Sequence, residues 1–291
     1  MLKWKANGKI LRVKELNVFN LSPPPRYRLA RAPLAQALVQ VRFPFIARLQ
    51  SAEAIAPIQD RLKDRYPYMN HRQEISLQMS SGPQTGVSSE LVWELSNDDG
   101  WIVVIGSGSA TLAVGSSYFG FDDFAERFQQ VLSILADEAK IARCDRLGTR
   151  YLSIAENPPG KDNGWQKWFQ PELTGWASSK IIKNSASCDL AMSQVHLRSE
   201  PDWRFSAIAP EIRAIVQHGL VPAGSGIPGL PPITTNSLSY ILGSDLYVES
   251  PQPFDVISLH EQFGVLHSEI DAFFRWSLTK LGEEHFGLEE L

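Results

Sequence analysis

The pattern of apolar and polar residues predicts many short strands interspersed with a few longer helices. Every second residue is apolar over residues 74–79, as in a strand with one face against a core. Residues 96–100, Ser-Asn-Asp-Asp-Gly, give a strong turn signal before the next apolar stretch. Alternation or a short apolar run predicts strands at 38–43, 74–79, 91–95, 101–105, 110–114, 188–197, 211–218 and 237–248.

Apolar residues at helical spacing predict three longer helices. The first covers residues 52–66. The second carries an apolar stripe over 121–135, with Asp123 placed as its N-cap. The third begins after a capping-box pattern at 258–261, ends at Gly282 and is the longest in the chain. Each stripe needs a sheet to cover.

The order of these elements predicts an α+β fold of two related halves. Each half is expected to be a mainly antiparallel sheet with packed helices, the second closed by the long C-terminal helix. Residues 27–142 form the first half and 143–291 the second, within one compact unit. Residues 1–26 are predicted to be a basic N-terminal extension. A loop rich in Pro and Gly over 221–236 is long enough to be functional or disordered.

Composition is that of an ordinary soluble globular protein, with 43% hydrophobic and 21% charged residues among 291. No apolar run approaches the roughly 18 residues of a spanning helix, and the first residues lack the apolar core of a secretory signal. We therefore expect a cytoplasmic protein with no membrane partner. Cys144 and Cys188 lie 44 positions apart without a CxxC pair, which predicts reduced, structural thiols.

Charge is distributed unevenly along the chain. Residues 1–31 hold eight basic side chains and one acid, a net of +7 in a protein whose total is −4. A basic arm on an acidic body can contact nucleic acid, an anionic partner or a second subunit. The simpler reading is a solvated extension, joined to the body by the stiff Pro23-Pro24-Pro25 segment.

Candidate catalytic and metal-binding groups do not fall at convincing spacings. Ser107 lies between two glycines but also between two predicted strands, so it lacks the strand-to-helix turn of a nucleophile. His260 and His267 are seven apart, whereas helical metal pairs use three or four. His267 and Asp271 have the spacing of a carboxylate-oriented base or of a surface hydrogen bond. We predict no catalytic residue, no metal and no cofactor.

Arg146 and Arg150 are the charged pair with the strongest case for a binding role. Four positions apart on a strand, they point to the same side and could grip a carboxylate or phosphate. The alternative is structural, with both arginines paired to acids such as Asp145 or Asp245. Arg146, Arg150 and Asp245 are therefore the predicted ligand-binding residues.

Tryptophans supply a second candidate surface. Trp165 and Trp168 mark a short predicted helix, and Trp176 follows it. If exposed, these three side chains would form a contact patch for a protein partner.

Four motifs stand in order across most of the chain: residues 32–38 with 41–43, Tyr118, residues 146–151, and His267 with Phe273 or Phe274. Together they resemble a family of sporadically distributed bacterial and archaeal proteins. The resemblance implies a patchy, horizontally spread family without an established activity, and it transfers no catalytic residue. Two departures are the basic arm before Tyr27 and Gly243, where the family pattern has another acidic residue.

Three hypotheses for function follow. The first is a non-enzymatic interaction or regulatory protein that binds a protein partner or itself, because potential contact aromatics are many and catalytic constellations are absent. The second is nucleic-acid or nucleotide binding through the basic arm with Arg146 and Arg150, in a mobile-element or defence setting suggested by the resemblance. The third is an enzyme acting on a small anionic substrate in a cleft between the halves.

Overall fold

The computed structural model of the chain describes residues 18–79, 85–156, 164–179, 181, 188–200, 206–226 and 235–291. Its strands are β1 (Tyr27–Leu29), β2 (Leu34–Arg42), β3 (Tyr68–Met79), β4 (Thr85–Ser96), β5 (Trp101–Ile105), β6 (Ser109–Val114), β7 (Arg143–Cys144), β8 (Arg146–Glu156), β9 (Ala191–Arg198), β10 (Arg213–Val221), β11 (Ser239–Val248), β12 (Gln252–Pro253) and β13 (Leu288–Glu290). Its helices are η1 (Ala47–Gln50), α1 (Ala52–Leu62), α2 (Phe121–Ile134), η2 (Leu135–Ala139), α3 (Trp165–Trp168), α4 (Pro171–Thr174), η3 (Gly175–Ser178), α5 (Val256–Ser277) and α6 (Lys280–Phe286).

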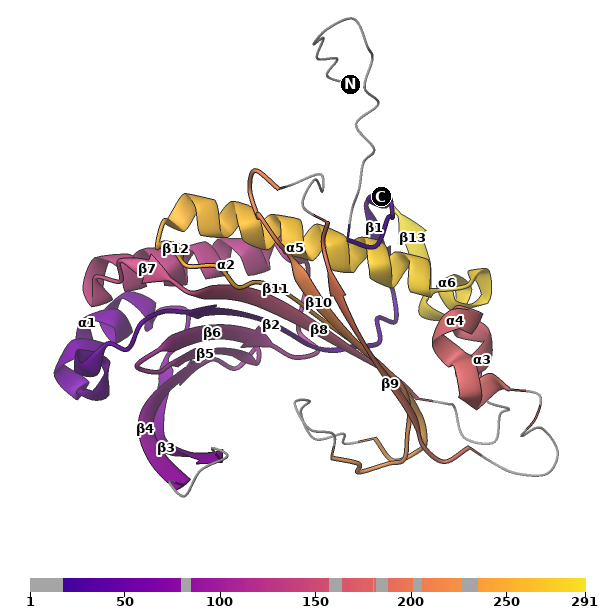
Figure 1. Ribbon diagram of the computed structural model, residues 1–291, viewed down its shortest axis with the longest axis horizontal. Coiled ribbons are helices and arrows are strands. Elements are labelled where there is room, and N and C mark those ends of the chain that lie inside the picture. Colours follow the sequence, from indigo (N-terminus) through magenta and orange to yellow (C-terminus); the bar gives the residue numbers. More distant parts are fainter. Residues whose placement is uncertain are drawn as a thin grey trace, which may run out of the picture.

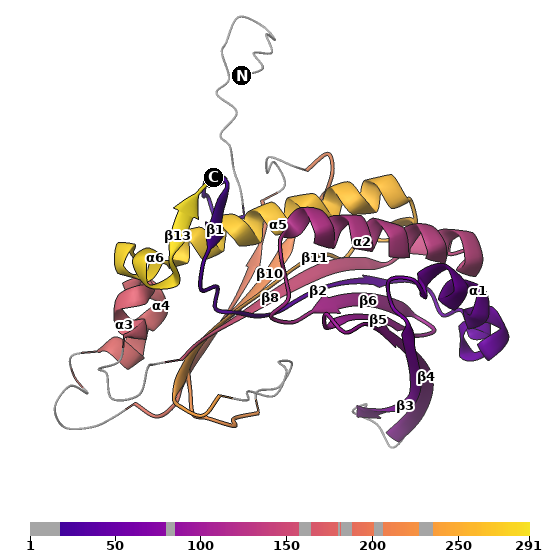
Figure 2. The ribbon, with the colours of Figure 1, turned by 180° about the vertical axis from the view of Figure 1, so that it is seen from behind.

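Within the described residues, nine strands form one continuous sheet in the order β3-β4-β5-β6-β2-β8-β11-β10-β9. Every neighbouring pair in this sheet is antiparallel. Helices α2 and α5 lie side by side along one face of the sheet (Figures 1 and 2). The predicted α+β class, with antiparallel strands and a long helix near the C-terminus, is confirmed.

The two halves share one strand order. In the first, β2 is followed by α1 and by a meander that returns through β6 to pair with β2. In the second, β8 is followed by α3 and by strands that return through β11 to pair with β8. The two sheets are not separate, because β2 and β8 pair along almost their full length at the centre. The β2–β8 pairing gives hydrogen-bond partners to two strand edges that would otherwise expose unpaired backbone groups.

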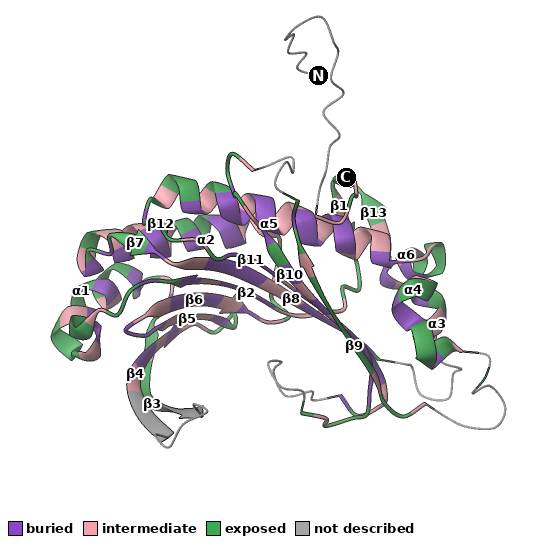
Figure 3. Ribbon diagram, in the orientation of Figure 1, coloured by how far each residue is buried: buried purple, intermediate pink, exposed green. Residues whose placement is uncertain are grey.

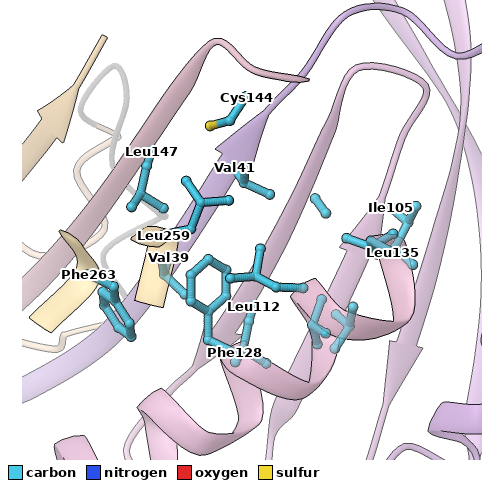
Figure 4. Packing of buried hydrophobic residues seen from close by; sticks show 14 of the residues in the cluster. Val39, Val41, Ile105, Leu112, Phe128, Leu135, Cys144, Leu147, Leu259 and Phe263 are labelled. Atoms are coloured by element: carbon cyan, nitrogen blue, oxygen red, sulfur yellow. The ribbon is translucent and has the colours of Figure 1, made fainter. Parts of the chain in front are cut away.

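The core lies between the sheet and the α2–α5 layer. Val39, Val41 and Leu147 point from β2 and β8 towards Phe128 of α2 and Phe263 of α5 (Figure 4). A second cluster lies under α3, α4 and α6, where Tyr240 and Leu242 of β11 meet the short helices. Figure 3 shows buried residues concentrated where the helices meet the central strands.

Three predicted helix boundaries are wrong. The first helix, predicted over residues 52–66, ends at Leu62. The N-cap of α2 is Gly120, and Asp123 lies inside the helix, where it forms an ion pair with Arg127. The long C-terminal helix ends at Ser277 because Leu278 adopts an extended backbone, and Gly282 lies inside α6. Strong apolar periodicity on both sides of Leu278 concealed this break.

Part of the predicted N-terminal extension is docked on the body. The N–H of Val18 donates to the buried carboxylate of Glu269 in α5 at 3.0 Å, and the ring of Phe19 stacks on Phe273 at 4.6 Å. Strand β1 then pairs with β13 near the C-terminus. We call residues 18–31 the N-terminal strap. Residues 1–17, which hold the remaining basic groups, lie outside the described residues, as do residues 227–234 of the predicted loop.

None of the helices in the described part of the chain combines the length and the apolar character needed to cross a membrane.

Candidate functional site

One face of the nine-stranded sheet carries no helix among the described residues. Residues that alternate with the core positions of the strands point to this face, opposite α2 and α5. The sheet bends away from the helices at both edges, so this side is concave (Figures 1 and 2). We call it the uncovered face. A broad sheet face of this kind can hold an extended segment of a partner.

Arg146, Arg150 and Asp245 meet at the centre of the uncovered face. The β8–β11 register places Arg150 opposite Asp245, and Arg146 lies four residues earlier on β8, on the same side of the strand. The carboxylate of Asp245 accepts from Arg150 Nη2 at 2.7 Å and from Arg146 Nη2 at 3.4 Å. The two arginines therefore share one side of the strand and converge, and their partner acid is Asp245. Asp145 pairs with Arg143 instead.

This cluster is shielded from solvent although no described helix covers it. Side-chain exposure is 13% for Arg146 and 15% for Asp245. The Arg146 guanidinium lies 4.2 Å from the ring centroid of Tyr247. It also folds over Gly148, where an added Cβ would lie 2.8 Å from Nη1 of Arg146. Burial lowers the pKa of Arg146, Asp245 opposes that shift, and the positive charge of Arg42 adds to it.

A ladder of polar side chains extends the cluster across β2 to β6. Arg42 Nε donates to Oε1 of Gln40 at 2.9 Å, and Nε2 of Gln40 donates to Oγ1 of Thr111 at 3.0 Å. The positive charges of Arg146 and Arg150 lie close to the carboxylate of Asp245, and the charges of Arg42 and Glu249 also act on Arg146. The centre of the uncovered face is therefore polar and ordered by its own contacts.

An apolar patch adjoins the charged cluster on the same face. Leu152, Val221 and Ile241 form a small buried cluster with Ile154 packed against it, and all four belong to strands β8, β10 and β11. Leu152 is 1% exposed and Val221 and Ile241 are 0% exposed, so these side chains pack this part of the sheet and offer no apolar surface to a partner.

The predicted tryptophan patch is wrong for two of its three members. Trp165 is fully buried and stacks on Tyr240 at 5.6 Å, while Trp168 is 8% exposed and stacks on His285 at 3.6 Å. Short amphipathic helices place such aromatics inward when a sheet lies beneath them. Trp176 alone of the three is exposed, at 69%.

A hydrogen-bonded group on the helix side was not foreseen as a unit. The hydroxyls of Tyr118 and Tyr151 lie 3.4 Å apart, and Tyr151 Oη lies 3.0 Å from Nδ1 of His267. The Phe121 ring stacks on His267 at 3.9 Å. We call Tyr118, Tyr151 and His267 the Tyr-His chain. All three belong to the motifs that carry the family resemblance, which is the one signal that groups them in the sequence.

Burial shifts the pKa values of the titratable groups of this region in the direction that favours their neutral forms. Burial lowers the pKa of His267 to about 3 and raises the pKa of Tyr118 to about 12. Asp271 accepts a hydrogen bond from Tyr27 at 2.7 Å, so it does not orient His267 as a base. Burial also raises the pKa of Asp271, although the Tyr27 hydrogen bond opposes the shift. A histidine with so low a pKa is a poor general base near neutral pH.

Other candidate chemistries also have structural explanations. Oγ of Ser107 donates to the carboxylate of Glu90 at 2.7 Å in the turn between β5 and β6. Among the described residues, no three His, Cys, Asp or Glu side chains are grouped as metal ligands would be. Cys144, buried in the core, and the half-buried Cys188 are both unpaired.

A surface depression of about 550 Å³ lies between α1 and α2, on the helix side. Its arginines are engaged already, because Arg61 forms ion pairs with Asp137 and Glu138 and Arg65 forms one with Glu126. The depression therefore offers less to a charged ligand than the centre of the uncovered face.

A search against protein-family models and a search of curated proteins found no match to this chain. The family resemblance of the four motifs stays a prediction.

Proposed function

We propose that the chain is a non-enzymatic binding protein that holds a protein partner on the uncovered face of its sheet. The observation that carries this proposal is the one-sided architecture. The helices of the described residues pack on one face, while the other is concave and lined by side chains fixed by their own contacts. A preorganised face loses little conformational entropy when a partner binds.

An enzymatic role has less support. The third hypothesis needs a cleft between the halves, but β2 and β8 join there in a hydrogen-bonded ladder. Ser107 is bound to Glu90, and His267 is neutral and enclosed by aromatic rings. The contacts of Ser107 and His267 are therefore structural, which favours a binding role over a catalytic one.

Nucleic-acid binding by the arm and the arginine pair together also has less support. Arg28 forms an ion pair with Glu289, and Arg31 donates to the backbone carbonyls of residues 284 and 285. These groups lie beside α5 and α6 on the helix side, whereas Arg146 and Arg150 lie on the uncovered face (Figures 1 and 2). One nucleic-acid strand would have to contact both sides of the sheet.

The proposed location is the cytoplasm, as the composition predicts, and the two unpaired cysteines accord with a reducing compartment. The mobile-element or defence setting remains an expectation from the family resemblance.

The experiment compares quantitative affinity capture by three proteins from nuclease-treated native lysate. Thr111→Arg and Ala113→Arg together place bulky charges on β6 at the centre of the uncovered face, and Ile257→Arg places one on exposed α5. Wild type and Ile257→Arg should recover the same protein at equal stoichiometry, and the double variant should lose at least about tenfold of it. Equal capture by all three proteins, or capture that nuclease removes, would contradict the proposal.

A further inference from the structure

Strand β9 is an edge of the nine-stranded sheet, and within the described residues it lacks the usual protection. It is the last strand in the sheet order, and among the described residues no other segment pairs with its outer side. Residues 192–196 are all exposed, including Met192 at 37% and Val195 at 42%. Natural proteins guard such edges with proline, lysine, bulges or covering segments, and β9 contains neither proline nor lysine.

The register of β9 on β10 shows which backbone groups point outward. The N–H of Ser199 donates to the carbonyl of Ile212 at 2.8 Å, in the register that pairs Arg198 with Arg213. Hydrogen-bonded and non-hydrogen-bonded pairs alternate along an antiparallel ladder. The N–H and C=O groups of Gln194, His196 and Arg198 therefore point away from β10. No strand among the described residues pairs with them.

We propose that two copies of this chain join edge to edge through β9, in an antiparallel pairing centred on Val195. A two-fold axis there places Gln194 opposite His196 of the second copy, and Met192 opposite its Arg198. The odd-numbered side chains point to the opposite face of the strand from the even-numbered ones. Among them, the two-fold axis places Val195 of one copy opposite Val195 of the other. This pairing covers the exposed Val195 side chain with the Val195 side chain of the second copy. It also gives the outward N–H and C=O groups of Gln194 and His196 hydrogen-bond partners.

Charge favours a second copy over a charged peptide. Arg198 is the only charged residue of β9, and the two-fold axis keeps the two copies of it at opposite ends of the interface. Its neighbour Arg213 is ion-paired with Glu211 and Glu249. These four side chains sum to zero, so the edge neither selects a charged partner nor repels its own copy. The proposal stands on this edge and does not rest on the binding role proposed above.

Two variants disrupt the proposed pairing without removing a hydrogen bond of the β9–β10 ladder. One removes an outward N–H, and the other places a charge at the two-fold axis. His196→Pro deletes one outward N–H, and His196→Thr keeps it at the same position. Val195→Lys places like charges opposite each other, and Val195→Thr is its matched control. Each full-length protein is measured by sedimentation equilibrium at micromolar concentration, with circular dichroism as a check on folding.

Wild type and the two threonine variants should have twice the chain mass of 32.5 kDa, and the proline and lysine variants should have that mass itself. Because Val195→Lys acts through an exposed side chain, it decides the matter even if the proline variant does not fold. A monomeric wild type overturns the proposal. The same result is expected if β9 pairs with a strand of a different protein, so that alternative also counts against it. A dimer that survives Val195→Lys also overturns it.

Discussion

Asp245 holds the charged centre of the uncovered face together. It lies between Arg146 and Arg150, and its carboxylate is 15% exposed. Removing one member of a shielded ion cluster is costly, because the remaining charges keep their desolvation and lose their partner. A ligand that binds here must compete with this internal pairing.

Asp245→Asn should therefore lower the free energy of unfolding by about 1–3 kcal/mol in urea denaturation. The matched control is Glu211→Gln, which disrupts the exposed ion pair with Arg213 and should cost less than about 1 kcal/mol. Equal losses for the two variants would show that Asp245 has no special structural role.

His267 should make stability depend on pH between about 3 and 6.5. Burial lowers its pKa from 6.5 to about 3, so below pH 6.5 the unfolded chain binds a proton that the folded chain does not. The stabilisation is complete above pH 6.5 and decreases as pH falls towards 3. The raised pKa of Asp271 works in the opposite direction at the acid end of this range.

The test compares melting temperatures of wild type and His267→Gln at pH 7 and pH 5. Wild type should lose more on acidification than the variant, because glutamine does not titrate and its amide can still meet Oη of Tyr151. Tyr118 and Asp271, the titratable neighbours, are the same in both proteins. Parallel pH dependence in the two proteins would exclude His267 as the cause.

At the level of elements, the N-terminal strap shows what periodicity does not detect. Residues 18–31 have no regular apolar pattern, and they bind through the Phe19–Phe273 stack, the Val18–Glu269 hydrogen bond and the β1–β13 pair. Each contact joins residues about 250 positions apart.

Phe19→Ala should destabilise the protein by about 1–3 kcal/mol, because it removes an aromatic ring packed on α5. Phe119→Ala is the control, since the Phe119 side chain is 94% exposed and its loss should leave the melting temperature unchanged. Thermal denaturation followed by circular dichroism measures both. A Phe19 variant as stable as the control would mean that the strap is not held by this ring.

At the level of the whole molecule, the seam between β2 and β8 makes the two halves one structural unit. Phe263 of α5 contacts Phe121, Phe124 and Phe128 of α2, so the helix layer is joined as well as the sheet. Neither half can open without exposing the other.

Differential scanning calorimetry should therefore give a single transition whose calorimetric and van't Hoff enthalpies agree. Phe263→Ala should shift this one transition to lower temperature without dividing it, because the ring packs on both halves. Two resolved transitions in either protein would show that residues 27–142 and 143–291 unfold separately.

The sequence alone determined the local structure. Alternation located the central strands, helical spacing located α1, α2 and α5, and a four-residue spacing on a strand put Arg146 and Arg150 on the same side. These properties depend on neighbours within a few residues, which is the range over which backbone geometry repeats.

Tertiary structure decided the rest. It chose Asp245 over Asp145 as the partner of the arginines, enclosed Trp165 and Trp168, joined two sheets into one and placed β9 at the edge of that sheet. Each of these outcomes depends on which distant segments become neighbours in space. A periodic pattern specifies that a residue has an apolar or polar neighbour, but only the folded chain specifies which residue that neighbour is.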